Sequence, residues 1–371
     1  MTETFEHLLA SQLLARARLS VPLLRELVAC HGPDPVRILE LREQLPPRPR
    51  ERLLAAVGDP NEPDIAQRAA SLGIRAVWLG DPEYPEALGP YDDAPALLFV
   101  RGGVLPRRPC VAVVGSRRPT SYGVEQADRF ARRFAGNGFP IVSGGAAGID
   151  AVAHQAALEC GQPTVAILGC GPDIAYPASN RALFQKVIAA GGALASEFPP
   201  GTKPEPWHFP ARNRIIAAWC IATLVVEAPE HSGALITARN AAEYGREVLV
   251  VPGPVDTGRS RGCHRLILDG ATLVDHPDDA FACALGHGGT QAGHDSSPTA
   301  PDPRPLPANL SADEVLLFHS AGELLVPFED LANRAGLRPE EAAVSATLLE
   351  LKGLLRREPG NRWSRQPGWA A

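Results

Sequence analysis

The chain has 371 residues, of which 45% are hydrophobic and 21% are charged. This length favours two or three domains, and the composition is that of a globular protein with a core of normal size. The net charge of −6 argues against indiscriminate nucleic-acid binding. Residues 107–214 nevertheless hold 12 Lys and Arg against 7 Asp and Glu, a local balance of +5, which indicates either a directed anion site or chance clustering on a solvated face.

Cysteine usage and the N-terminus indicate a soluble, cytoplasmic protein. The seven cysteines are odd in number and form no CxxC pair, so free thiols in a reducing compartment fit better than a disulfide framework or a zinc site. Residues 1–20 carry acidic residues near their start and lack the long apolar core of a signal peptide. No apolar run approaches the ~20 residues of a membrane span.

Residues 1–88 are predicted to form a small helical domain. Two groups of apolar residues recur there at helical spacing: Leu8, Leu9, Leu13 and Leu14, and then Leu23, Leu24, Leu27 and Val28. Gly32-Pro33 and the proline-rich stretch 46–49 interrupt the pattern. Nothing in this region specifies a ligand.

The middle of the chain alternates apolar strands with helices. Strands are predicted at 110–115, 139–144, 164–169, 193–198, 221–228 and 247–253, and helices at 121–137, 149–160, 180–190 and 234–244. Strands that are apolar throughout are expected where both faces of a sheet are covered. The order predicts an α/β fold with a doubly wound, Rossmann-like parallel sheet over residues 89–285.

The C-terminal part is predicted to be a flexible linker, 286–309, followed by a winged-helix domain, 310–371. The linker is rich in Gly, Pro, Ser and Asp. Helices are predicted at 311–320, with Ser311 as N-cap and Glu314 completing a capping box, and at 328–334 and 339–352, and a β-hairpin wing at 354–364. The candidate recognition helix carries only Arg338 and Lys352 as basic residues against three glutamates, which favours packing against protein or weak duplex binding.

The segment VVGSRRPT, residues 113–120, is a candidate anion site. A strand ends at Gly115, and the turn into the next helix offers free N–H groups at a helix N-terminus. Gly115 allows close approach of a phosphate, Ser116 supplies a hydroxyl, and Arg117 and Arg118 supply guanidinium groups. A second loop, SGGAAGID, brings Ser143, Gly144 and Gly145 to the same edge of the sheet, although such glycines also serve tight turns.

A second candidate segment is GTKPEPWHFPARNRII, residues 201–216. It interleaves cations with aromatic rings, the pattern that single-stranded nucleic acid requires: Lys203, Trp207, Phe209, Arg212, Asn213 and Arg214. The alternative places the two rings in the core and pairs Arg212 and Arg214 with carboxylates such as Glu197 and Glu227.

The sequence predicts no cofactor, no metal and no catalysis. A dinucleotide would need GxGxxG after the first strand of the sheet and an acidic residue after the second, and neither is present. Asp150 and His154, four apart on one helix, are interpreted as a hydrogen-bonded structural pair rather than a catalytic one. Ser232 and Thr237 have no identifiable base beside them.

A set of motifs resembles the DNA processing protein A (DprA, Smf) family: VGSRRPTSYG, SGGAAGIDAVAH, AILGCGPDIAYPASN, SEFPPGTKP, FPARNRIIA, VVEAPEHSGALITA and GREVLVVPGP, in that order. The resemblance is strong over residues 105–275. It implies a small N-terminal helical (SAM-like) domain and a homodimer formed through the Rossmann-like domain. It also implies single-stranded DNA binding, protection of incoming DNA, and loading of the RecA recombinase during natural transformation.

The resemblance also assigns residues. It implies that Gly115, Ser116 and Arg117 hold phosphates and that Lys203 and the segment 212–214 line the same pocket. Two positions depart from the family pattern, because Ala147 stands where Arg is usual and His264 where Asn is usual.

Two other functions stay open from the residues alone. One is a nucleotide-processing hydrolase of a related Rossmann-like fold, although HSGALITA replaces the PGGxGT loop of such enzymes. The other is a protein-interaction scaffold without DNA binding, which Ala147 makes conceivable.

Overall fold

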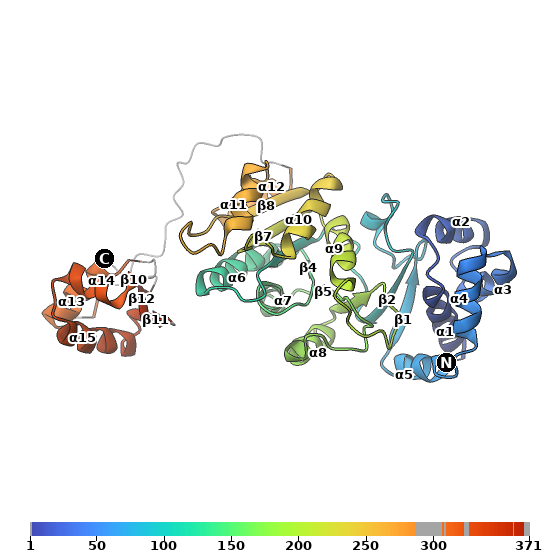
Figure 1. Ribbon diagram of the computed structural model, residues 1–371, viewed down its shortest axis with the longest axis horizontal. Helices are drawn as coiled ribbons and strands as arrows, with labels where there is room; N and C mark the ends of the chain where they lie inside the picture. Colours follow the sequence, from blue (N-terminus) through green and yellow to red (C-terminus); the bar gives the residue numbers. More distant parts are fainter. Residues whose placement is uncertain (1, 287–305, 308, 323–325, 359, 367–371) are drawn as a thin grey trace. The chain divides into compact units, whose positions relative to one another are not determined.

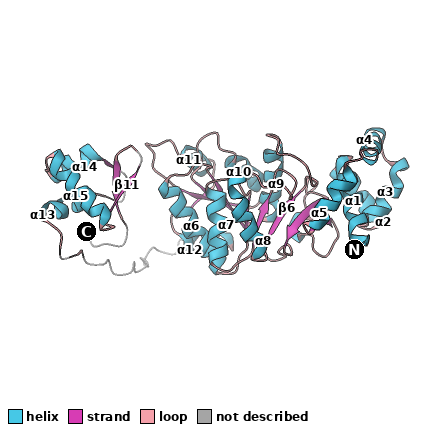
Figure 2. Cartoon of the chain, turned by 90° about the horizontal axis from the view of Figure 1, so that it is seen from below, coloured by secondary structure: helices cyan, strands magenta, loops and turns pink. Residues whose placement is uncertain are grey.

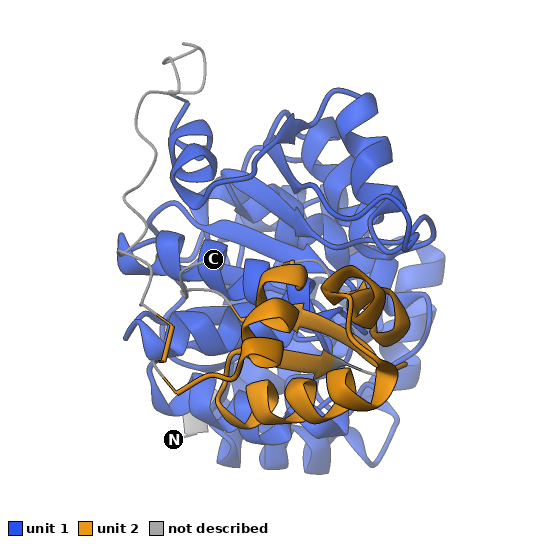
Figure 3. Cartoon of the chain, turned by 90° about the vertical axis from the view of Figure 1, so that its left-hand side faces the viewer, with its two compact units in different colours: residues 1–290 blue, residues 291–371 orange. Residues whose placement is uncertain are grey.

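The structure of the protein is a computed structural model that describes residues 2–286, 306–307, 309–322, 326–358 and 360–366 (Figure 1). Helices precede the first strand, and helices and strands alternate from residue 111 to residue 273; Figure 2 distinguishes the two by colour. The chain divides into two compact units, residues 1–290 and 291–371 (Figure 3). Each unit is described by itself.

The first unit is built on a nine-stranded sheet with the order β1-β2-β6-β5-β4-β3-β7-β8-β9. The strands from β3 to β9 run parallel, whereas β2 pairs antiparallel with both β1 and β6. Because β4 and β7 flank β3, the chain order reverses beside β3, which makes this the switch point of the sheet. The strand bounds are Ile74–Trp78, Leu97–Gly102, Val111–Gly115, Ile141–Ser143, Thr164–Ile167, Ala193–Ser196, Ala222–Val226, Glu247–Val251 and Thr272–Leu273.

Helices cover both faces of the parallel strands, as their continuous apolar sequences require. One face packs against α6 (Ser121–Gly136), α7 (Ile149–Glu159) and α12 (Pro277–Ala284). The other face packs against α9 (His208–Trp219), α10 (Ala234–Glu243) and α11 (Arg261–Leu268). In β3, Val111 and Val113 face the first layer, and Ala112 and Val114 face the second. A large, mostly parallel α/β sheet is therefore confirmed.

The N-terminal helices share a core with the edge of this sheet. They are α1 (Thr2–Arg16), α2 (Val21–His31), α3 (Pro35–Glu40), α4 (Pro47–Val57) and α5 (Glu62–Ser71). Their apolar residues pack with Ile74, Trp78, Leu97 and Phe99 of β1 and β2, and the Trp78 indole N–H donates to Ser11 Oγ at 3.0 Å. The prediction of helix up to residue 88 is therefore wrong at β1, which belongs to the sheet.

The other predicted elements of the first unit form, with ends shifted by a few residues. Helix α8 (Arg181–Ala189) lies within the predicted 180–190, and β7 is shorter than the predicted 221–228. The sequence analysis missed β2, α9, α11, β9 and α12. The missed helix α9 matters most, because it carries Phe209 and the segment 212–214.

The second unit contains α13 (Ala312–Ser320), β10 (Val326–Pro327), α14 (Phe328–Ala335), α15 (Pro339–Leu351), β11 (Leu355–Glu358) and β12 (Arg362–Arg365). Ser311 caps α13, and Glu314 closes the predicted capping box. The hairpin of β11 and β12 forms, and β10 joins it as a third strand. Apart from residues 286, 306–307 and 309, the predicted linker lies outside the described residues.

Two global properties follow from the described residues. None of their helices is long and apolar enough to cross a membrane. Every cysteine is a free thiol, with Cys110, Cys170, Cys220 and Cys263 buried and Cys30 exposed.

Candidate nucleic-acid interface

The predicted site residues gather at one edge of the sheet. Parallel strands end at the same edge, so the loops that follow β3, β4 and β6 meet there. Residues 116–120 follow β3, residues 144–148 follow β4, and the segment from Glu197 to Trp207 leads from β6 into α9. The two predicted segments therefore belong to one surface.

The loop after β3 is held by Glu227, a residue that is 3% exposed. Both carboxylate oxygens of Glu227 lie 3.0 Å from the Thr120 N–H, and the Thr120 hydroxyl donates to the same carboxylate. Thr120 is the N-cap of α6. The chain's own carboxylate therefore occupies the anion position at this helix N-terminus.

Most backbone N–H groups of this loop are already satisfied. The Ser116 N–H donates to the Glu227 carbonyl at 2.8 Å, and the Arg118 N–H donates to Ser116 Oγ at 3.2 Å. The expectation that these groups are free for a phosphate is wrong for Ser116, Arg118 and Thr120. The side chains of Arg117 and Arg118 are both exposed and remain available to an anion.

The glycines of the two loops serve close packing. A Cβ on Gly115 would lie 1.9 Å from the Val226 carbonyl oxygen, and one on Gly144 would lie 2.6 Å from both Arg212 and Asp150. Gly145 has φ +64°, a conformation that favours glycine. The tight-turn alternative thus accounts for Gly115, Gly144 and Gly145. Buried Ser143 donates its hydroxyl to the Val113 carbonyl at 2.6 Å. Contact of these four residues with DNA stays a prediction.

Arg117 lies over an aromatic ring from another element. Its guanidinium carbon is 5.5 Å from the ring centre of Phe209 in α9. That ring lies 5.4 Å from Tyr176, which the sequence analysis did not select and which is 42% exposed. A cation beside half-exposed rings suits both a phosphate and a stacked base.

Lys203 and Trp207 are also exposed, in the segment between β6 and α9. Trp207 is 53% exposed, so the alternative that places it in the core is wrong. Its indole packs against the Arg18 guanidinium at 5.6 Å and the His208 ring at 4.0 Å. Within the described residues, neither Arg117, Arg118 nor Lys203 has an ion-pair partner.

The segment 212–214 is occupied by internal contacts. Arg212 is 5% exposed and donates to the Gly144 carbonyl at 2.6 Å. Burial lowers its pKa to about 10, while Asp150 acts in the opposite direction. Asn213 donates to the Gly233 carbonyl at 3.2 Å, and Arg214 pairs with Glu197 at 2.7 Å. The alternative of ion pairing is therefore confirmed for Arg214, and DNA contact by these three residues stays a prediction.

Asp150 and His154 do not form the predicted hydrogen-bonded pair. Asp150 accepts from the Gly144 and Ala146 N–H groups at 3.1 and 3.2 Å, and burial raises its pKa. His154 is fully buried and lies 2.8 Å from Thr164 Oγ1. Because the Thr164 hydroxyl donates to the Ile141 carbonyl, the His154 Nδ1–H donates to Thr164. His154 is therefore a neutral core residue.

We expect His154 to make the protein less stable in weak acid. Burial lowers the pKa of His154 from 6.5 to about 3, so the folded chain binds fewer protons than the unfolded chain between these values. The contribution of His154 to the free energy of unfolding is therefore complete above about pH 6.5. Below that pH it falls by up to about 1.4 kcal/mol per pH unit. Urea unfolding at pH 7, 6 and 5 measures this slope. His154→Asn, which keeps a donor for Thr164, should reduce the slope, and an unchanged slope would contradict the assignment.

Within the described residues, no group of His, Cys, Asp or Glu side chains could hold a metal ion. At the second departure from the family pattern, His264 Nε2 lies 2.9 Å from the Gly253 carbonyl oxygen. The first departure, Ala147, is half-buried in the loop after β4. Both positions are compatible with the fold.

Comparisons with known proteins show which family the chain belongs to. The family model of DNA recombination-mediator protein A matches residues 75–284. Protein Smf of Synechocystis is 35% identical over 315 residues, which span 77% of this chain and 79% of the relative. DNA processing protein DprA of Streptococcus pneumoniae is 45% identical over 200 residues, 54% of this chain and 70% of the relative.

Solved structures lead to the same family. The X-ray structure of DprA from Streptococcus pneumoniae has a TM-score of 0.62 at 35% identity, and the match covers 73% of this chain and 95% of that one. DNA processing protein A from Helicobacter pylori, whose structure addresses its single-stranded DNA binding mode, has a TM-score of 0.51 at 29% identity over 57% of this chain and 96% of that one. This chain therefore belongs to the DNA recombination-mediator protein A family.

Proposed function

We propose that this chain binds single-stranded DNA without altering it chemically, protects incoming DNA, and delivers it to the RecA recombinase during natural transformation. The observation that carries the proposal is a set of cations and rings at one sheet edge, of which Phe209 is half-buried and the others are exposed: Arg117, Arg118, Tyr176, Lys203, Trp207 and Phe209. The single-stranded DNA binding mode described for the Helicobacter pylori relative supports it.

The binding mode is electrostatic with stacking. Because the N–H groups of Ser116, Arg118 and Thr120 are satisfied within the protein, most phosphates are bound by guanidinium and ammonium groups. Bases stack on exposed rings at about 1–3 kcal/mol each without being read. Low sequence preference and a marked salt dependence follow.

A hydrolase is the weaker alternative. Ser232 accepts a hydrogen bond from the Ala234 N–H at 3.3 Å, which is the bond of a turn, and Thr237 is 2% exposed. The anion position at the N-terminus of α6, beside the switch point, is filled by Glu227. These contacts favour binding over catalysis, and we propose that the chain is not an enzyme.

The test of the function is fluorescence anisotropy of a labelled single strand of about 25 nucleotides, at about 50 and 200 mM salt. We expect binding that weakens steeply at the higher salt and that an unlabelled single strand of another sequence displaces. The absence of binding at both salt concentrations would contradict the proposal. It would favour the alternative of a protein-interaction scaffold without DNA binding.

We propose that two copies act together through the Rossmann-like domain. Two sites on one strand raise affinity through effective concentration. Sedimentation velocity at micromolar concentration tests this. A chain that stays monomeric would contradict the gain in affinity from two copies, but it would not contradict the DNA site of one copy.

The second unit, which we propose to be a winged helix, contributes little to DNA binding. Arg338, the N-cap of α15, is paired with Glu341, and Lys352, its C-cap, is paired with Glu314 at 2.6 Å. The outer face of α15 exposes Val344, Leu348 and Leu351 instead. Such a face suits protein contact rather than base edges.

Removing residues 291–371 should therefore leave the affinity for single-stranded DNA within about threefold of the full chain, because no cation of the proposed site is lost. The anisotropy titration measures this on residues 1–290, which form a compact unit. A tenfold or larger loss would place DNA contacts in the second unit.

A further inference from the structure

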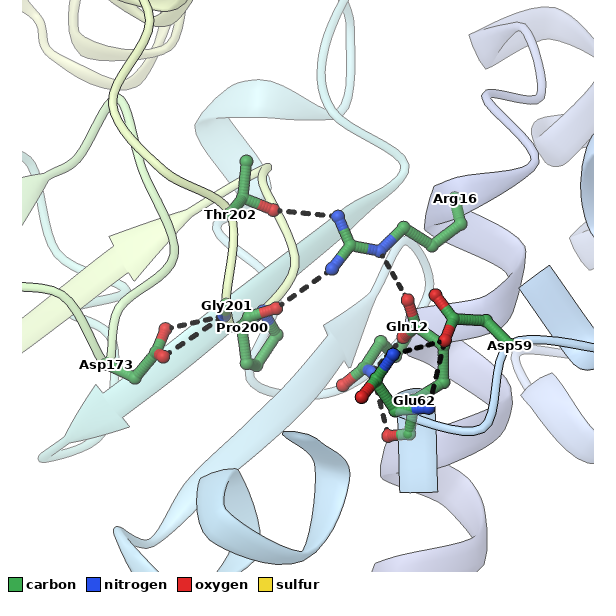
Figure 4. Close-up of polar contacts among 9 residues, drawn as sticks. Gln12, Arg16, Asp59, Glu62, Asp173, Pro200, Gly201 and Thr202 are labelled. Carbon is green, nitrogen blue, oxygen red and sulfur yellow. Dashed lines mark hydrogen bonds and ion pairs between the residues drawn. The ribbon is translucent and has the colours of Figure 1, made fainter. Parts of the chain in front are cut away.

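The end of α1 is fixed to the loop that carries Lys203 and Trp207. Arg16, the last residue of α1, pairs with Glu62 at 3.0 Å. The same guanidinium donates to Thr202 Oγ1 at 3.2 Å and to the Pro200 carbonyl at 3.3 Å. Figure 4 shows this guanidinium between the N-terminal helices and the loop. The position of the helices against this loop is therefore specified by hydrogen bonds.

The loop is also fixed from its other side. Both carboxylate oxygens of Asp173 accept from the Gly201 N–H, at 3.0 and 3.1 Å. Gly201 has φ +76°, which favours glycine. Residues 200–202 are thus held between Arg16 and Asp173 (Figure 4), directly before Lys203.

Two residues beyond Arg16, Arg18 is placed over the exposed indole of Trp207. Its guanidinium carbon is 5.6 Å from the ring centre, and its side chain is exposed. Its backbone has φ +51°, which non-glycine residues rarely adopt. No acidic partner for Arg18 is found among the described residues. A strained backbone therefore presents an unpaired cation beside an aromatic ring of the proposed DNA site.

A cavity of about 1180 Å³ adjoins the same place. Lys203 lines it together with residues of the N-terminal helical region, including Arg16, Arg68, Asp59 and Asp64. Three cations and three acids line it, because Glu62 is a further lining residue, so the cavity as a whole does not attract a polyanion. The attraction for a phosphate comes from the exposed guanidinium of Arg18, which lies outside this lining.

We propose that the C-terminal end of α1 forms the outer end of the single-stranded DNA site. The strand leaves Arg117 and Phe209, passes Trp207 and Lys203, and places a phosphate against Arg18. This inference rests on the proposed function and extends it, because it assigns a DNA contact to the N-terminal helical region. No ligand could be predicted for this region from the sequence alone, because Arg18 lies almost 190 positions from Trp207 in the chain.

The test is Arg18→Gly in the full chain. Glycine accepts φ +51° without strain, so the variant removes the guanidinium without a cost to the fold, and its thermal midpoint should not fall. Anisotropy titrations use single strands of about 6 and about 25 nucleotides. For the long strand we expect binding to be about threefold to tenfold weaker and the slope of log affinity against log salt to fall by about 0.7. The loss should be larger for the long strand than for the short one.

The control is Arg37→Ala, which removes one exposed arginine from α3. This helix carries none of the residues of the proposed site. Titration of Arg117→Ala in parallel separates the proposed DNA site at Arg117 from its proposed extension to Arg18. Binding that depends on Arg117 but not on Arg18 overturns this inference alone, as does an equal loss for both strand lengths. Wild-type protein that binds neither strand overturns the proposed function and this inference together.

Discussion

Replacing Arg117 and Lys203 together by alanine is expected to weaken single-stranded DNA binding at least about a hundredfold near physiological salt. Both side chains are exposed and, within the described residues, unpaired. Each can therefore give a phosphate a charge-assisted hydrogen bond worth about 1.5–3 kcal/mol. The slope of log affinity against log salt should fall by about 1.4 for two lost phosphate contacts. Anisotropy at two salt concentrations measures both quantities.

The matched control is Arg37→Ala/Lys186→Ala. It removes the same charge from exposed positions on α3 and in the last turn of α8, so it tests net charge without touching the site. The control should bind within about threefold of wild type, and both double variants should keep the wild-type unfolding midpoint because all four side chains are exposed. An equal loss of affinity in the two variants would show a diffuse electrostatic effect and would contradict a defined site.

The sequence predicted the residues whose own side chains we propose to bind DNA. Arg117, Lys203 and Trp207 carry chemistry that is visible in a one-dimensional pattern, because cations and rings are suited to single strands wherever they are exposed. Their exposure is confirmed. Arg18 was not predicted from the sequence, because its proposed role depends on a contact with Trp207. Only the packing of α1 against the loop creates that contact.

The physical roles of the glycines and of Glu227 were the least predictable part. A glycine at a strand end has the same local signature whether a phosphate or a neighbouring strand approaches it. The Val226 carbonyl beside Gly115 and the Glu227 carboxylate at the N-terminus of α6 come from β7 and the residue after it, more than 100 positions away. Such pairings are set by sheet order, which local periodicity does not encode.

The same difference between local patterns and long-range pairing explains which parts of the fold could be predicted. The central strands were predicted because burial on both faces makes them continuously apolar. The antiparallel pair β1 and β2 lies at the sheet edge under the N-terminal helices. β1 was read as part of the preceding helical region although Gly73, with φ +69°, separates it from α5. Helix α9 was missed because its first residues, HisPhePro, combine poor helix formers with a proline that is tolerated only in a first turn.

Glu227→Ala is expected to lower the free energy of unfolding by about 3 kcal/mol, because a buried carboxylate that accepts from Thr120 is lost together with a favourable charge at the N-terminus of α6. Glu227 has φ +49°, and alanine keeps that strained backbone without the hydrogen bonds that hold it. The loop that carries Arg117 loses its side-chain attachment at Thr120 and keeps only the backbone bond from Ser116. Affinity for single-stranded DNA should therefore also fall, by about tenfold, as the arginine is held less firmly in place. Urea unfolding followed by circular dichroism and the anisotropy titration measure the two effects.

Glu227→Gln and Glu230→Ala separate the causes of this loss. Glutamine keeps one acceptor for the Thr120 N–H but removes the charge, so it should cost about 1–2 kcal/mol. Glu230 is exposed in the loop after β7, three residues beyond Glu227. Its replacement should change the free energy of unfolding by no more than about 0.5 kcal/mol. A Glu227→Ala variant as stable as Glu230→Ala would mean that the carboxylate does not hold the loop. If Glu227→Ala is destabilised and also binds DNA weakly while Glu227→Gln retains most of both properties, the hydrogen bond to Thr120 is what positions Arg117 for the strand.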